Sequence, residues 1–455
     1  MTGDAKKQRT MSDYDALLAS VTKRCDAAGQ SHILAHLSDD GIEEDAKLSF
    51  LRSVDAMPLE KIADYLRGAV EEEEKIKRGG DGGDVIEPFA GETASTTDAS
   101  QLAALAEAHA TGVRAVAAGE VAAVLLAGGQ GTRLGFDGPK GMYDIGLASK
   151  RTLFQFITER LKALGRLSGR GDKAVPFYVM TSPLNHQATT EYFAKHDNFG
   201  VDVRFFPQGT LPALTLEGRM ILETPTSLTV APDGNGGIYP ALVRHGILED
   251  MKAKGVKYIH VFGVDNALVK PADPTFVGYC IQKDADCGNK VLWKTSPGEK
   301  VGVVATKGGK PCIVEYSDIS EEMTKRKGDD GRLVFGAGNI CNHFYTMDFM
   351  ANTIVPNLGN MYHIAHKKIP YYDDVKKETV KPTANNGIKL ESFIFDVFPL
   401  SRRMAVLDVA RAEEFAPVKN PPGTPTDSPD SARELFRNVA WAREEEEQAL
   451  RRTAL

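Results

Sequence analysis

"VAAVLLAGGQGTRLGFDGPKG", residues 121–141, joins a short apolar run to a loop that carries six glycines. The run Val121–Ala127 is aliphatic and has the length of a buried strand. Glycine lets backbone N–H groups approach an anion, because no Cβ stands in the way. Ligands of α/β sheets bind at the carboxyl ends of the strands, so the stretch predicts an anion site directly after this strand.

After Gly119, short apolar runs alternate with amphipathic helical patterns, which predicts βαβ units and a mostly parallel sheet. We therefore expect an α/β fold, a Rossmann-like doubly wound mixed sheet with a helical amino-terminal region and a small carboxyl-terminal domain. The predicted strands are Val121–Ala127, Val175–Thr181, Val201–Phe206, Lys257–Val264, Lys290–Lys294 and Gly302–Thr306. The predicted helices include Thr152–Leu164, His186–His196, Tyr239–Gly255 and Ser431–Arg452.

Changes in composition suggest three regions: a helical region over residues 1–118, a main α/β domain over 119–400 and a small domain over 401–455. A Pro-rich loop, "NPPGTPTDSPDS", begins at Asn420 and precedes the charged terminal helix. The run "EEEEKIKRGGDGGD" (Glu71–Asp84) is typical of a solvated helix face followed by a flexible turn.

Two better-known glycine motifs do not match the loop. Gly129, Gly131 and Gly135 form G-x-G-x-x-x-G, which is one residue longer than the dinucleotide fingerprint. A P-loop needs G-x-x-x-x-G-K-[ST], whereas Lys140 arrives here between Pro139 and Gly141. A nicotinamide-dependent enzyme and a P-loop ATPase are both disfavoured.

Two cations stand in the same loop. Arg133 offers planar, bidentate recognition of phosphate oxygens, and Lys140 offers a mobile point charge. Together they can neutralise the charge that develops when a phosphoryl group is attacked. The loop therefore predicts polyphosphate binding.

The composition is that of an ordinary soluble protein, with 42% hydrophobic and 26% charged residues and a net charge of -7. No basic stripe points to nucleic acid or an anionic membrane, and no apolar run has the length of a membrane span. Five dispersed cysteines without a Cys-x-x-Cys pair predict reduced thiols. We expect a cytoplasmic protein, and the terminal Thr-Ala-Leu only loosely matches a peroxisomal address.

The pattern G-G-x-G-T-R-L followed by Pro-Lys-Gly resembles the signature of sugar nucleotidyltransferases of the UDPGP type. The eukaryotic UDP-N-acetylglucosamine pyrophosphorylases are the more similar branch, and the resemblance extends over about residues 120–420. It implies a fold of the nucleotide-diphospho-sugar transferase type, with the nucleotidyltransferase domain and its sugar-binding part in residues 119–400. The matching stretches include "QGTLPAL", "APDGNGGIY", "HVFGVDNALVK", "VEYSDIS", "GAGNICNHF", "NGIKLESFIFDVF" and "FAPVKN".

The resemblance also implies roles for individual residues. Asp265 follows an apolar strand, and the resemblance makes it the Mg²⁺ ligand as well as a UTP contact. The catalytic residues would be Arg133, Lys140 and Lys389. Leu126, Ala127, Gly128, Gly129, Gln208 and Gly234 would bind UTP and its uridine. Asn235, Gly302, Glu315, Asn339 and Lys419 would bind the sugar and its phosphate. Pro240 departs from the residue usual in the family, which puts the local helix start in question.

The implied reaction joins UTP to N-acetyl-α-D-glucosamine 1-phosphate and releases diphosphate and UDP-N-acetylglucosamine, with Mg²⁺ as cofactor. The sugar phosphate is already an anion, so alignment and charge neutralisation suffice for an in-line attack. We expect small-molecule substrates, no nucleic-acid or membrane partner, and a monomer or weak homodimer. Two alternatives stay open: a broader UDP-sugar pyrophosphorylase, and a nucleotide-sugar-binding regulator without catalysis.

Overall fold

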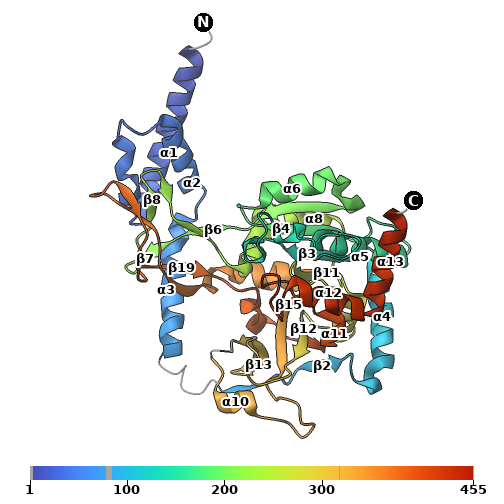
Figure 1. The fold of residues 1–455 in the computed structure, drawn as a ribbon. Helices are drawn as coiled ribbons and strands as arrows, with labels where there is room; N and C mark the ends of the chain where they lie inside the picture. Colours follow the sequence, from blue (N-terminus) through green and yellow to red (C-terminus); the bar gives the residue numbers. More distant parts are fainter. Residues whose placement is uncertain (1–3, 78–84, 317, 454–455) are drawn as a thin grey trace. The chain divides into compact units, whose positions relative to one another are not determined.

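The computed structural model describes residues 4–77, 85–316 and 318–453 (Figure 1). Contacts divide the chain into two compact units that alternate along the sequence. Unit 1 contains residues 1–82, 209–237 and 357–394, and unit 2 contains 83–208, 238–356 and 395–455. The boundaries expected after residues 118 and 400 do not separate these units, and the expected three-region division stays a prediction.

Unit 2 is built on an eleven-stranded sheet, whose main path runs in the order β2-β20-β12-β15-β11-β3-β4-β5. Along this path only β15 runs antiparallel to its two neighbours, so the carboxyl ends of the other seven strands meet at one edge. The strands are β2 (Glu92–Ser95), β20 (Met404–Asp408), β12 (Cys287–Trp293), β15 (Ala337–Thr346), β11 (Tyr258–Gly263), β3 (Val121–Leu126), β4 (Phe177–Thr181) and β5 (Val203–Pro207), with β1 (Ile86–Pro88), β13 (Val303–Lys307) and β14 (Lys310–Val314) paired beside them.

The central strands are buried on both faces, as their continuous apolar runs predict. One face of β3 and β4 packs into a core shared with α4 (Leu102–Ala117), α5 (Leu153–Leu167) and α9 (Pro274–Gln282). On the other face, Tyr178 Oη donates to Asp250 of α8 (Ile247–Ala253) at 2.6 Å, and Tyr239 of α7 (Ile238–Arg244) donates to Tyr345. Helices therefore cover both faces, and the predicted doubly wound mixed α/β sheet is confirmed.

Two glycines let α4 and α9 pack backbone to backbone. A Cβ added at Gly112 would lie 1.9 Å from the carbonyl oxygen of Pro274, and one added at Gly278 would lie 1.8 Å from that of Ala108. No larger residue fits at this crossing without separating the helices. The helix α9 in turn packs against β12, β15 and β20.

Most of the predicted elements form, with breaks inside two of the helices. Gly246 has a φ of 62° and separates α7 from α8, where one helix from Tyr239 to Gly255 was expected. Val439 is extended and separates α12 (Pro429–Asn438) from α13 (Ala440–Thr453). Pro240 lies in the first turn of α7, a position that tolerates proline because its N–H would have no partner there. The remaining two predicted helices form as α5 and as α6 (His186–Lys195).

Two short strands interrupt the helical pattern expected before Gly119. β1 pairs with β13, and β2 pairs with β20, so this stretch belongs to the sheet of unit 2. β2 buries only its last two residues. An edge strand this short shows no alternation that a sequence pattern can reveal.

Unit 1 packs three helices against small sheets. Its core contains Phe50, Leu51, Ile62, Leu214 and Ile388. The helices are α1 (Asp4–Ala27), α2 (Glu44–Asp55) and α3 (Leu59–Lys77). The strands are β16 (His363–Lys367), β19 (Gly387–Glu391) and β7 (Leu214–Thr215) in one sheet, with the pairs β10 (Val230–Pro232) and β6 (Thr210–Pro212), β17 (Tyr371–Asp373) and β18 (Glu378–Val380), and β8 (Leu222–Thr224) and β9 (Ser227–Leu228).

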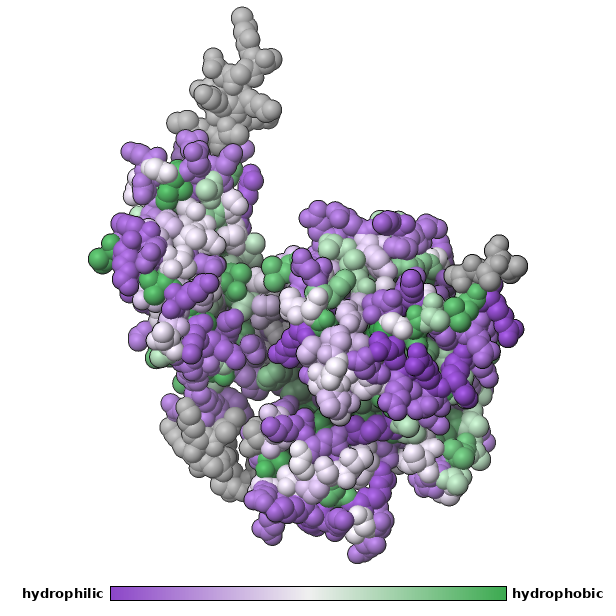
Figure 2. All heavy atoms as spheres, viewed as in Figure 1, coloured by the Kyte–Doolittle hydropathy of each residue, from purple (hydrophilic) through white to green (hydrophobic). Residues whose placement is uncertain are grey.

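Hydrophilic side chains cover most of the face of unit 2 seen in Figure 2, with apolar residues scattered among them. None of the described helices is both long enough and apolar enough to cross a membrane. All five cysteines are free, as expected. Residues 454–455, which belong to the loose match to a peroxisomal address, lie outside the described part of the chain.

Candidate active site

The glycine loop leaves β3 at the carboxyl edge of the sheet and closes on itself. Lys140 N donates to Gly129 O at 3.1 Å, and Gly131 N donates to Gly138 O at 2.8 Å. Gly135 has a φ of 69° and ends a single helical turn that carries Arg133. The loop therefore returns its second cation, Lys140, to the point where the strand ends.

The strand β5, which pairs with β4 beside β3, brings the expected residue Gln208 to this loop. Gln208 follows β5, and its backbone N–H donates to Thr181 O at 2.8 Å. A Cβ added at Gly128 would lie 2.7 Å from the Gln208 Oε1 atom, so the amide lies directly against the backbone of the loop. Leu126 ends β3, and Ala127 N donates to Met180 O of β4 at 2.8 Å.

Asp265 reaches the same edge from β11, which pairs with β3 in parallel. Its carbonyl oxygen accepts from Val418 N at 2.8 Å, so the segment before Lys419 runs alongside it. Lys419 Nζ lies 3.7 Å from Asp265 Oδ2. The carboxylate is half-buried and the lysine is half-exposed.

The charges of this cluster act on Lys140. Burial lowers the pKa of the Lys140 ammonium group below its ordinary value, and the Asp265 carboxylate opposes that shift. The positive charges of Lys419 and Arg133 lower the same pKa further. The structure thus brings three cations and one carboxylate together at the ends of β3 and β11. Such an arrangement favours a bound anion, because negative charge would relieve both the burial cost and the mutual repulsion.

The fold and this arrangement agree with the comparisons to known proteins. A model of the UTP–glucose-1-phosphate uridylyltransferase family matches residues 83–422. The chain belongs to this family. Its members transfer a uridylyl group from UTP to a sugar 1-phosphate.

Individual relatives are similar over most of the chain. UDP-N-acetylhexosamine pyrophosphorylase-like protein 1 of Xenopus tropicalis is 47% identical over 343 residues, which are 73% of this chain and 66% of that protein. UDP-N-acetylglucosamine pyrophosphorylase of Saccharomyces cerevisiae is 46% identical over 71% of this chain and 69% of its own. The chain thus spans about two thirds of the length of these relatives.

A solved structure is similar in fold. The UDP-N-acetylglucosamine pyrophosphorylase of Trypanosoma brucei superimposes with a TM-score of 0.80 and 29% identity, covering 93% of this chain and 84% of that one. The expected assignment to UDPGP-type nucleotidyltransferases is therefore confirmed.

The donor set of this candidate site fits a magnesium ion whose remaining ligands come from substrate phosphates. Asp265 supplies a half-buried, hard carboxylate oxygen at the sheet edge. Within the described ranges, no group of three or more His, Cys, Asp or Glu residues is arranged to hold a metal by protein ligands alone. Mg²⁺ commonly takes one or two carboxylates plus substrate phosphates, so a lone carboxylate beside phosphate-binding cations suits it.

Three of the expected sugar-binding residues lie together in unit 2. Asn339 N donates to Gly302 O at 2.8 Å, and a Cβ added at Gly302 would lie 3.0 Å from Glu315 Oε1. Burial, and then the charge of Asp318, raise the pKa of the Glu315 carboxyl above its ordinary value. Asn339 Oδ1 accepts from Cys341 N at 3.2 Å, so its oxygen is oriented.

The other three expected residues belong to unit 1. Gly234 has a φ of 87°, and its missing Cβ leaves room for Ser392 O, which would lie 2.1 Å from such an atom. Asn235 Oδ1 accepts from Ile394 N at 2.9 Å. Lys389 stands on β19 opposite Ala365, with a half-buried side chain. Their roles stay predictions.

Sequence reasoning missed two buried asparagines that hold the site's segments. Asn185 Nδ2 donates to Ala127 O at 2.9 Å and to Gly129 O at 3.3 Å. Asn266 Oδ1 accepts from Ala416 N at 2.9 Å, in the segment that leads to Lys419. Asn266 directly follows Asp265 and was visible in the motif, whereas Asn185 looked like an ordinary residue at a helix start.

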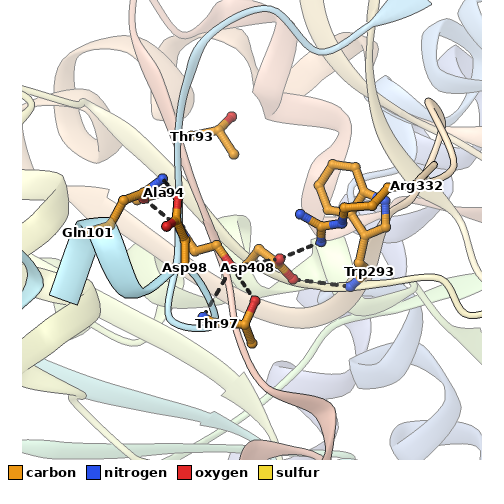
Figure 3. A pocket seen from close by; sticks show the side chains of 9 residues that line it. Thr93, Ala94, Thr97, Asp98, Gln101, Trp293, Arg332 and Asp408 are labelled. Carbon is orange, nitrogen blue, oxygen red and sulfur yellow. Dashed lines mark hydrogen bonds and ion pairs between the residues drawn. The ribbon is translucent and has the colours of Figure 1, made fainter. Parts of the chain in front are cut away.

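A separate cavity of about 420 Å³ lies at the same sheet edge, beside β2, β20 and β12 (Figure 3). Asp408, at the end of β20, accepts from Ser95 Oγ at 2.9 Å, from Arg332 Nη2 at 2.7 Å and from Trp293 N at 3.2 Å. The Arg332 guanidinium lies 4.0 Å from the centre of the Trp293 ring. Sequence reasoning singled out none of these residues.

Proposed function

We propose that the chain is a UDP-N-acetylglucosamine pyrophosphorylase, which forms UDP-N-acetylglucosamine and diphosphate from UTP and N-acetyl-α-D-glucosamine 1-phosphate. One observation carries the proposal: Arg133, Lys140 and Lys419 converge with Asp265 beside the glycine loop. The names of the Saccharomyces and Trypanosoma proteins support the choice of substrate.

In this proposal the glycine loop and its cations bind the triphosphate. Backbone N–H groups of the loop approach the phosphates, while Arg133 and Lys140 neutralise their charge. Gln208 reads the uracil with its amide, which can both donate and accept at a base edge. Its position against Gly128 supports this role, because the base would then extend from the loop that holds the phosphates.

Asp265 would hold Mg²⁺ together with substrate phosphates. When bound, the metal would supply Lewis-acid polarisation of the α-phosphate. Lys419 lies 3.7 Å from the Asp265 carboxylate, so a phosphate entering here would meet a cation beside the metal ligand. Among the described residues no group of three or more His, Cys, Asp or Glu side chains surrounds a metal, which supports a metal whose other ligands come from substrate and water.

Glu315, Asn339 and the Gly302 backbone would recognise the sugar hydroxyls and N-acetyl group. A carboxyl with a raised pKa and an oriented amide reject analogues that leave them without a partner. On the resemblance of their motifs, we also propose that Gly234 binds the uridine, that Asn235 binds the sugar and that Lys389 is catalytic.

The chemistry requires no general base. The sugar phosphate is an anion that attacks the α-phosphorus in line with the departing diphosphate. The residues of the chain align the two phosphates and offset the repulsion between them, which is the main barrier to bringing them together. Free cysteines support our further proposal that the enzyme works in the cytoplasm, on small molecules.

The proposal is tested by measuring diphosphate release from UTP against a panel of sugar 1-phosphates, with Mg²⁺ and with EDTA. We expect N-acetylglucosamine 1-phosphate to give the highest kcat/KM and EDTA to abolish turnover. Equal or better turnover of glucose or galactose 1-phosphate would establish the broader UDP-sugar enzyme. Tight UDP-N-acetylglucosamine binding without turnover would establish the regulator.

A further inference from the structure

Asn185 occupies the position directly before α6, where an asparagine side chain usually accepts a hydrogen bond from the first turn of the helix. Here the side chain makes no such capping bond. It is fully buried, and its Oδ1 accepts instead from Ser182 N at 2.8 Å, just beyond the end of β4. A residue type that usually caps a helix therefore makes its hydrogen bonds outside its own helix.

The amide nitrogen of Asn185 is used on the glycine loop. It donates to Ala127 O at 2.9 Å and to Gly129 O at 3.3 Å. The Gly129 carbonyl oxygen also accepts from Lys140 N at 3.1 Å. One buried side chain is therefore bonded to both ends of the turn that begins the loop and shares an acceptor with the backbone of Lys140.

We propose that Asn185 is a positioning residue that holds the glycine loop and Lys140 in the geometry that receives the triphosphate. The inference rests on the proposed function for its catalytic consequence. The hydrogen bonds hold the Ala127 and Gly129 carbonyls against the buried amide. Because a trans peptide points its N–H away from its C=O, the N–H groups of Gly128 and Gln130 then face away from Asn185. Because the side chain is fully buried, any effect of Asn185 on the substrate is transmitted through the loop that it holds.

The sharpest test is Asn185→Asp, which preserves shape and replaces the donor by an acceptor. A carboxylate oxygen would then face two carbonyl oxygens, while an acid before α6 would favour the helix through capping and the helix dipole. The variant therefore distinguishes a role of Asn185 in holding the loop from a role in capping α6. Gln187→Glu is the matched control, because it makes the same amide-to-carboxylate change at an exposed position on α6.

We expect Asn185→Asp to lower kcat/KM for UTP about 100-fold, with KM for the sugar phosphate changed less than about threefold. Lowering the pH should restore part of the activity, since a protonated carboxyl can donate one of the lost hydrogen bonds. Hydrogen–deuterium exchange of peptides covering residues 127–141 should be faster than in the wild type. Gln187→Glu should match the wild type in all three measurements.

Asn185→Ser is the second variant, because serine can still bond locally but is too short to reach the loop carbonyls. It should show the same faster exchange without the pH recovery. Wild-type exchange and wild-type UTP kinetics in both variants would overturn the inference. If the wild type itself releases no diphosphate, the proposed function fails, whereas faster loop exchange in the variants would still support the positioning role.

Discussion

The glycine loop and the cavity around Asp408 both lie at carboxyl ends of strands in the same sheet, yet they differ in how well their positive and negative charges balance. At the glycine loop, three cations meet one carboxylate, and burial lowers the pKa of Lys140. In the cavity, Asp408 is satisfied by Ser95, Trp293 and Arg332. The glycine-loop cluster has an excess of positive charge, whereas the Asp408 carboxylate in the cavity already has three hydrogen-bond donors.

A well-formed cavity therefore does not by itself mark the reactive site. A polar network whose members satisfy one another stabilises the fold, because each buried group has a partner. An excess of one charge sign costs stability, and it is kept where a ligand of the opposite sign binds. Substitutions in the two places should therefore separate activity from stability.

The largest effect is expected from Lys140→Met. Removing this cation should lower kcat/KM for UTP by about 10²- to 10³-fold, as loss of a transition-state donor does. The melting temperature should be unchanged or slightly higher, because the substitution relieves burial and repulsion of a charge. Steady-state kinetics and thermal unfolding measure both, and Lys173→Met is the exposed control. Normal turnover in a folded Lys140→Met enzyme would remove the role of Lys140.

Asp408→Ala should show the opposite behaviour. It leaves the donors from Ser95, Trp293 and Arg332 without their acceptor, which should lower the free energy of unfolding by about 2 kcal/mol. Turnover per folded molecule should stay within about threefold of the wild type, because the effects of substitutions at distant sites are usually independent of one another. Urea unfolding and kinetics below the transition check this. A large loss of kcat with wild-type stability would end the distinction between the two places.

The smallest effect concerns pH. Lysine is charged below its pKa, and that of Lys140 is lowered, so kcat/KM for UTP should fall on the alkaline side at a lower pH than an ordinary lysine would produce. Arginine stays protonated, so Lys140→Arg should move this alkaline fall to higher pH with less than about a tenfold loss at neutral pH. Identical alkaline limbs in the two enzymes would assign the ionisation to another group.

Much of unit 2 was predictable because its strands are buried on both faces and therefore carry continuous apolar runs, as in β3 and β4. The break at Gly246 was less visible, since apolar spacing continues through it and only the positive φ reveals it. The site was predictable where it lies in one loop, as for Arg133 and Lys140. Asn185 was not, because its partners at residues 127 and 129 are remote in sequence.

Two runs of four glutamates show the same limit. Glu71–Glu74 lies on α3 and is mostly exposed, as the sequence predicts for a solvated face. In Glu444–Glu447, by contrast, Glu445 pairs with Arg160 at 3.0 Å, and Glu446 pairs with the buried Arg151 at 2.8 Å. These contacts attach α13 to the start and middle of α5.

The family, the buried strands and the glycine loop with its two cations can be inferred from the sequence, because these depend on residues adjacent in the chain. Which charges find partners is evident only in the folded chain: Glu445 pairs with Arg160 on α5 and Glu446 with Arg151 just before it, while the three cations of the glycine-loop cluster share one carboxylate. The physical reason is that the energy of a charge depends on burial and on neighbours within a few ångströms, and those neighbours are brought together by folding.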